Sequence, residues 1–118
     1  NWRAWLRAPI PDRYPNSNTR ALVRLGRVLR ERGSRLILLD APLHPAALLA
    51  DSEGRIDAYR KQLHELAAAE GLELLVPEQL VELSPQDFAD WVHLAPAGSE
   101  RLSAALANAL ETRVAERP

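Results

Sequence analysis

The sequence contains no cysteine, which excludes disulfide bonds, thiolate metal sites and a cysteine nucleophile. No apolar run approaches the roughly 18 residues of a membrane-spanning helix, and no signal peptide is recognisable. Glycine-rich phosphate loops, internal repeats and low-complexity tracts are also absent. Aromatic residues make up only 5% of the chain. The apolar content is mostly leucine and alanine, which suit helices better than strands.

The chain carries no excess of charge, since its formal net charge is −1. We therefore expect neither nucleic acid nor an anionic membrane as a partner. Lys61 is the only lysine, and we interpret the abundance of arginine as genome composition. Arg20, Arg24 and Arg27 line one face of the first predicted helix. We expect them to be solvated and paired with acidic neighbours; the alternative is a stripe that binds an anion or a polymer.

The length of 118 residues is that of one domain, and an apolar fraction of 47% excludes a disordered or collagen-like chain. The chain begins at Asn1 rather than Met, so we expect it to be part of a longer protein. Pro9, Pro11 and Pro15 forbid a long helix near the start. Residues 1–16 are therefore predicted to be an irregular lead-in, although an extra strand hidden there is the alternative.

Helices and short buried strands alternate along the rest of the sequence. Capping residues, apolar spacing and glycine stops predict three long helices: one from Ser17 or Asn18 to Gly33, one over Ser52–Glu70 and a last one from Pro96. Apolar runs predict strands over Arg35–Asp40 and Leu72–Val76. A helical turn near 78–83 and a cap at Ser84 are predicted before the last helix. The predicted inner faces of the three long helices are Leu22, Leu25, Val28 and Leu29, then Ile56, Tyr59, Leu63 and Leu66, then Leu102, Leu106, Leu110 and Val114.

This order predicts an α/β fold, because a strand, a helix and a strand joined by short connections form a parallel pair with a right-handed crossover. We predict a flavodoxin-like three-layer αβα architecture in one domain over residues 1–118. Two parallel strands make a poor sheet, since stable sheets generally need three or more. We therefore expect the domain to be partial, and its sheet to be completed by a missing N-terminal half or by a second copy of the chain.

Asp90 and His93 are the candidate catalytic residues. Residues three apart on a helical turn point to similar sides. An aspartate there can accept a hydrogen bond from one imidazole nitrogen and leave the other nitrogen as a base near neutral pH. The alternative is that Asp90 only caps a turn and that His93 packs at the start of a helix.

The surrounding motif, F-x-D-x-x-H-L-x-x-x-G from Phe88 to Gly98, is followed by an amphipathic helix. It resembles the last conserved block of the SGNH hydrolase superfamily, the GDSL-type esterases and lipases. Related D-alanine-transfer proteins and polysaccharide O-acetylation proteins share this ending. The resemblance covers about residues 18–110 and implies that Asp90 and His93 belong to a Ser-His-Asp triad. It also implies that no cofactor or metal is needed and is compatible with an extracytoplasmic location.

The chain departs from the family at the nucleophile, because no serine here lies in the Gly-Asp-Ser motif that follows the first strand in the family. The family's oxyanion glycine and asparagine blocks are not recognisable either. Asn16 or Asn18 could stand near the asparagine position, Asn18 as a substrate-binding residue, and helix capping explains them equally well. The resemblance therefore implies the C-terminal portion of an SGNH-like domain, inactive by itself.

Two functions follow as hypotheses. The first is part of an ester hydrolase or O-acyltransferase that acts on an ester or an acylated sugar; the alternative is a non-catalytic α/β binding or assembly module without the nucleophile. His44 follows a strand, where open α/β sheets place their sites. It could line an acyl or sugar pocket or be a loop histidine without function. His64 is predicted to be structural, and no spacing supports a metal site from Asp40, His44 and His93.

Overall fold

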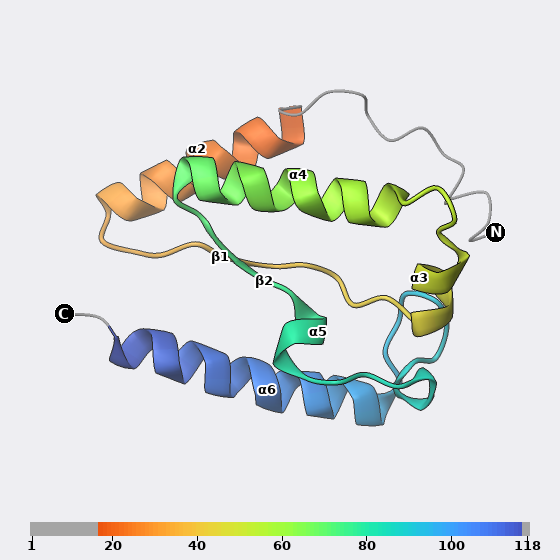
Figure 1. Ribbon diagram of the computed structural model, residues 1–118. Helices are drawn as coiled ribbons and strands as arrows, with labels where there is room; N and C mark the ends of the chain where they lie inside the picture. Colours follow the sequence, from red (N-terminus) through yellow and green to blue (C-terminus); the bar gives the residue numbers. More distant parts are fainter. Residues whose placement is uncertain (1–16, 117–118) are drawn as a thin grey trace. The chain divides into compact units, whose positions relative to one another are not determined.

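The computed structural model describes residues 17–116, so the lead-in predicted for residues 1–16 lies outside the described part of the chain. Its elements are α2 (Ser17–Glu31), β1 (Ile37–Leu39), α3 (Pro45–Ala50), α4 (Arg55–Glu70), β2 (Glu73–Leu75), α5 (Pro77–Leu80), the 3-10 helix η1 (Pro85–Asp87) and α6 (Pro96–Ala115). Figure 1 labels the α-helices and the two strands. β1 and β2 form a two-stranded parallel sheet. The described chain is thus a mostly helical α/β structure.

The predicted helices and strands are present, with shifted limits. The strands are three residues long each, shorter than the predicted runs. α4 begins at Arg55 rather than near Ser52, because Gly54 adopts a left-handed conformation with a φ of 65°. The carboxylate of Asp51 accepts hydrogen bonds from the backbone N–H groups of Arg55 (2.9 Å) and Ile56 (2.7 Å). This carboxylate satisfies two N–H groups of the first helical turn.

No helix was predicted between the strand ending at Asp40 and the helix starting near Ser52, yet α3 forms there. Pro45 occupies the first helical position, where its fixed φ is compatible with a helix. Nδ1 of His44 accepts a hydrogen bond from the backbone N–H of Ala46 at 3.0 Å. His44 therefore caps α3 as serine or aspartate usually caps a helix. Histidine is not among the usual capping residues, so no start signal for this helix was recognisable.

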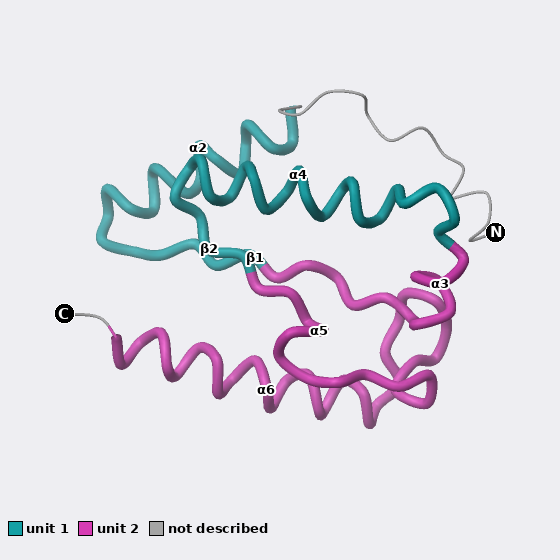
Figure 2. Tube along the Cα trace, viewed as in Figure 1, with its two compact units in different colours: residues 1–38, 51–74 teal, residues 39–50, 75–118 magenta. Residues whose placement is uncertain are grey.

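The described chain divides into two compact units (Figure 2). Unit 1 comprises residues 17–38 and 51–74, and unit 2 comprises residues 39–50 and 75–116. The division falls within both strands.

In unit 1, arginines of α2 hold the C-terminal end of α4. Arg27 forms an ion pair with the carboxylate of Glu70 at 2.8 Å. Arg30 donates to the backbone carbonyl oxygens of Glu70 (3.1 Å) and Gly71 (3.2 Å). A guanidinium at this position satisfies the last carbonyl groups and complements the negative end of the helix dipole. The predicted pairing of the arginine face with acidic neighbours is therefore confirmed at Arg27.

Several apolar side chains that were predicted to be buried are exposed. On the predicted inner faces, the exposed residues are Leu25, Val28, Tyr59 and Val114. β1 has no buried residue, and in β2 only Leu75 is buried, so the prediction of strands covered on both faces is wrong here. Leu39 of β1 is 41% exposed. The sheet of the described chain thus leaves apolar surface uncovered. Within residues 17–116, no helix combines the length and apolarity needed to cross a membrane.

In unit 2, α6 contacts α5 and η1, and Leu102 of α6 is buried. Gly98, in the first turn of α6, packs directly against the backbone of Asp87. A Cβ atom at position 98 would overlap the carbonyl oxygen of Asp87. Gly26 of α2 is also tightly packed, but there a Cβ atom would overlap a side-chain atom, the terminal methyl carbon Cδ2 of Leu72. The two glycines therefore differ in whether the neighbouring atom can move.

We expect Gly98→Ala to destabilise the protein by about 1–3 kcal/mol, because backbone atoms must shift to relieve the overlap. Helix propensity alone would predict a gain of about 1 kcal/mol. Gly26→Ala is the matched control. There the flexible Leu72 side chain can move, and we expect a stability within about 1 kcal/mol of the wild type. Denaturant unfolding of both variants measures the difference; an equal or higher stability for Gly98→Ala would contradict the packing described here.

Candidate functional site

The candidate site lies in unit 2, on the loop that joins η1 to α6. An isolated antiparallel bridge pairs Phe88 with Leu94 and closes the loop. The backbone N–H of Ala89 donates to the carbonyl oxygen of His93 at 2.8 Å. Asp90 and His93 therefore lie on a closed loop, not on the helical turn that was predicted for them. Their three-residue spacing brings them together through this loop geometry.

Asp87 anchors the base of the loop through its backbone and its carboxylate. The backbone N–H of Ala95 donates to the Asp87 carbonyl oxygen at 2.8 Å. The buried carboxylate accepts from the backbone N–H (2.8 Å) and the hydroxyl (3.1 Å) of Ser84. Arg101 of α6 donates to the same oxygen at 2.6 Å and to the carbonyl oxygen of Glu82 at 2.7 Å. The cap predicted at Ser84 is confirmed, and it belongs to a network that ties η1 to α6.

These contacts keep Asp87 ionised. The backbone N–H of Ser84 is the largest cause that lowers the pKa of Asp87, and the Ser84 hydroxyl and the Arg101 guanidinium act in the same direction. Burial opposes them but does not prevail. A buried carboxylate with these partners is satisfied in its charged form, so the anchor is stable at neutral pH.

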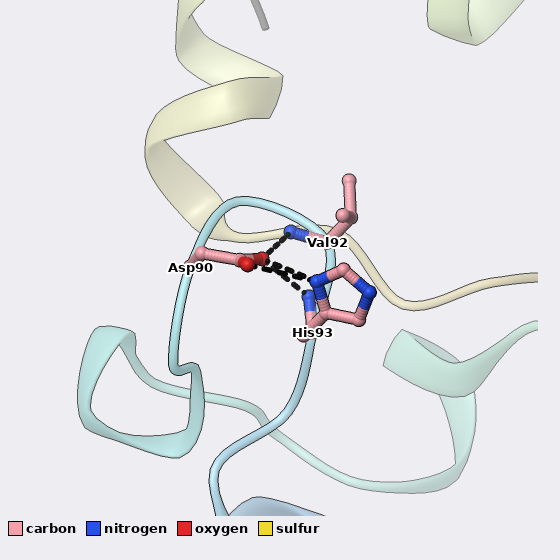
Figure 3. A network of polar contacts seen from close by, with 3 residues as sticks. All are labelled: Asp90, Val92 and His93. Atoms are coloured by element: carbon pink, nitrogen blue, oxygen red, sulfur yellow. Dashed lines mark hydrogen bonds and ion pairs between the residues drawn. The ribbon is translucent and has the colours of Figure 1, made fainter. Parts of the chain in front are cut away.

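The Asp90 carboxylate has two sets of partners (Figure 3). Oδ1 accepts hydrogen bonds from the backbone N–H groups of Val92 (2.9 Å) and His93 (2.8 Å). Nδ1 of the His93 imidazole lies 2.9 Å from Oδ1 and 2.8 Å from Oδ2. Asp90 therefore both caps the turn and holds the ring. The two interpretations of this residue from the sequence are compatible, because one carboxylate has enough acceptor positions for both.

These hydrogen bonds define the protonation states of the pair. The backbone N–H of Val92, the largest cause, together with the imidazole and backbone N–H of His93, lowers the pKa of Asp90 to about 2. At neutral pH this carboxylate is ionised and can only accept hydrogen bonds. In a neutral His93, Nδ1 must then carry the proton, and Nε2 carries the free lone pair. The ring is thus held in the tautomer that a general base requires.

The free nitrogen faces solvent. The His93 side chain is 74% exposed and that of Asp90 is 53% exposed. In Figure 3 the second ring nitrogen of His93 points away from Asp90. Across residues 17–116, no group forms a hydrogen bond with Nε2 of His93. The pair can therefore accept a proton from a group that approaches from outside this part of the chain.

The other candidate residues lie in different places. His44 is brought to the same loop, since its backbone N–H donates to the carbonyl oxygen of Trp91 at 3.0 Å. Asn18 lies in unit 1 as an exposed residue in the first turn of α2, and the site described in unit 2 is built without it. His64 is an exposed residue of α4. In the part of the chain that the structure describes, no three His, Asp or Glu side chains gather in a way that could hold a metal ion.

Sequence reasoning missed the residues that support the pair. Ser84 was predicted to be a cap, but its partner Asp87 was not recognised. The ion pair of Asp87 with Arg101 joins residues 14 positions apart and leaves no local pattern. The close approach of Gly98 likewise depends on tertiary packing. Phe88 was recognised only as part of the motif around Asp90 and His93, and Trp91 carried no signal beyond its apolar character.

We expect the Asp90 carboxyl to titrate with a pKa of about 2. Its contribution to stability is present above the ordinary value of 3.8 and is lost as the pH falls through about 2. His93→Ala should raise this pKa only part of the way toward 3.8, because the N–H of Val92 remains. Carbon-detected NMR of the carboxyl group measures both values, with His64→Ala as the control. A wild-type value at or above 3.8 would show that the hydrogen bonds are not formed.

The comparisons with known proteins found nothing similar to this chain: no protein-family model matches it, and neither a curated protein nor a solved structure does. The resemblance to SGNH hydrolases therefore depends on the motif around Asp90 and His93, and it stays a prediction. The geometry of the site supplies the physical basis for the function considered next.

Proposed function

We propose that Asp90 and His93 are the acid–base part of a Ser-His-Asp triad in an SGNH-type ester hydrolase or O-acyltransferase. The observation that carries the proposal is the hydrogen bonding of His93. Its Nδ1 is bound by an ionised carboxylate, and its Nε2 is exposed and free of partners among residues 17–116. A base oriented in this way is what activation of a serine hydroxyl requires.

In the proposed reaction, the serine belongs to a segment outside this chain. His93 Nε2 takes the proton of the serine hydroxyl as the oxygen attacks the carbonyl carbon of an ester. The imidazolium then gives this proton to the departing alcohol, and an acyl-serine remains. Water or a sugar hydroxyl attacks the acyl group after losing its proton to Nε2, and the serine is released with that proton. Asp90 stabilises the imidazolium at each stage.

The same proposal includes the rest of the fold. We propose that the two-stranded sheet is part of a flavodoxin-like three-layer αβα domain, whose other strands come from an N-terminal half or from a second copy. The three-residue strands and the exposed Leu39 of β1 support this, since two strands rarely form a stable sheet. The substrate would be an ester or an acylated sugar.

A non-catalytic binding or assembly module is the second candidate. The structural role of Asp90 favours this candidate, because its hydrogen bonds with the backbone N–H groups of Val92 and His93 by themselves explain an aspartate at this position. No serine of this sequence lies in a Gly-Asp-Ser context, which also agrees with a module that lacks the nucleophile.

The test uses the longest natural form of the protein. We expect a fluorophosphonate probe to label one serine and His93→Ala to lower both the labelling rate and kcat/KM for an aryl ester by about 10²–10⁴-fold, because the general base is removed. His64→Ala, which changes an exposed histidine of α4, should leave both rates unchanged. Absence of labelling in the wild type, or full labelling of His93→Ala, would rule out the hydrolase and favour the module.

A further inference from the structure

His44 is connected to the loop that carries Asp90 and His93 through its backbone. The N–H of His44 donates to the carbonyl oxygen of Trp91 at 3.0 Å. Trp91 lies between Asp90 and His93 in the sequence. This hydrogen bond therefore holds the loop at a residue that lies between Asp90 and His93 in the sequence.

The imidazole of His44 makes two aromatic contacts with the same loop. Its centroid lies 5.3 Å from that of Phe88, with an angle of 61° between the rings. The same centroid lies 5.2 Å from the ring centroid of Trp91, with an angle of 57° between the rings. These inclined arrangements are the ones that aromatic pairs prefer. Phe88 precedes Asp90 in the sequence and is buried, and Trp91 directly follows Asp90. The ring of His44 therefore contacts the loop through one residue before Asp90 and one residue after it.

The orientation of the His44 ring is itself fixed by α3. Nδ1 accepts the hydrogen bond from the backbone N–H of Ala46, and a backbone N–H can only donate. A neutral His44 therefore carries its proton on Nε2. Among residues 17–116, the His44 ring forms no hydrogen bond with Asp90 or His93. Any influence of His44 on the pair must pass through Phe88 and Trp91.

We infer that His44 is a positioning residue: its ring, packed on Phe88 and Trp91, holds the loop in the form in which Asp90 binds Nδ1 of His93. The importance of this role for catalysis rests on the proposed function. The effect of the His44 ring on the hydrogen bond between Asp90 and His93 does not rest on it, because this effect requires neither a nucleophile nor a substrate. His44 contributes a cap to α3 and a ring to the loop, and these two contributions can be separated by substitution.

The test measures the tautomer of neutral His93 by long-range ¹H–¹⁵N NMR in the 118-residue chain. His44→Asn keeps an acceptor for the N–H of Ala46 but removes the ring, and we expect loss of the Nδ1–H preference of His93, toward a mixture of both tautomers. His44→Phe keeps an aromatic ring but removes the acceptor, and we expect it to retain the wild-type preference. His64→Ala, in unit 1, is the control and should change nothing.

The two variants decide the outcome even if one of them loosens α3. A wild-type tautomer ratio in His44→Asn would overturn the inference, and so would equal loss in the Asn and Phe variants, because the ring would then not be the cause. The tautomer measurement is independent of fluorophosphonate labelling. A failure of the positioning role is thus distinguishable from a failure of the proposed function.

Discussion

The hydrogen bonds of one carboxylate, that of Asp90, determine both the shape of the loop and the orientation of the His93 ring. This carboxylate accepts from the backbone N–H groups of Val92 and His93 and from the His93 imidazole. The backbone bonds give the loop its shape, and the same shape places the ring over the carboxylate. The local stability of the loop and the protonation pattern of His93 therefore have a common cause. The low pKa of Asp90 is the electrostatic consequence of this arrangement, since every one of these contacts favours the ionised form.

The rest of unit 2 keeps this loop in place. At its base, Asp87 joins the cap at Ser84 to Arg101 of α6, and Gly98 allows the first turn of α6 to approach the Asp87 backbone. The pair itself stays open to solvent. An exposed base with a fixed tautomer is useful only to a group that comes to it. The proposed serine from another segment satisfies this requirement, and the exposed Leu39 of β1 agrees with a sheet that extends beyond these two strands.

Local features of the structure were predictable from the sequence. Apolar spacing and glycine stops indicated the helices and the parallel strand pair, and the Asp90–His93 spacing indicated their interaction. The structure differs from these predictions where tertiary contacts or an unusual capping residue determine the local conformation. The helix at Pro45–Ala50 was missed because its cap is His44, and the pair lies on a closed loop because the bridge between Phe88 and Leu94 forms there. Leu25, Val28 and Val114 have helical spacing but lie exposed, since periodicity indicates which face is apolar and not whether a neighbour covers it.

The most direct test of the central claim is NMR of Asp90→Asn in this chain. The asparagine Oδ1 can still accept from the N–H groups of Val92 and His93, but the side chain has no negative charge and no second acceptor oxygen for the imidazole. We predict that the backbone amide shifts of the loop stay close to those of the wild type while His93 loses its preference for the Nδ1–H tautomer. A His93 ring that keeps this tautomer, or a loop that loses its fold in the variant, would contradict the claim that one carboxylate performs two separable tasks.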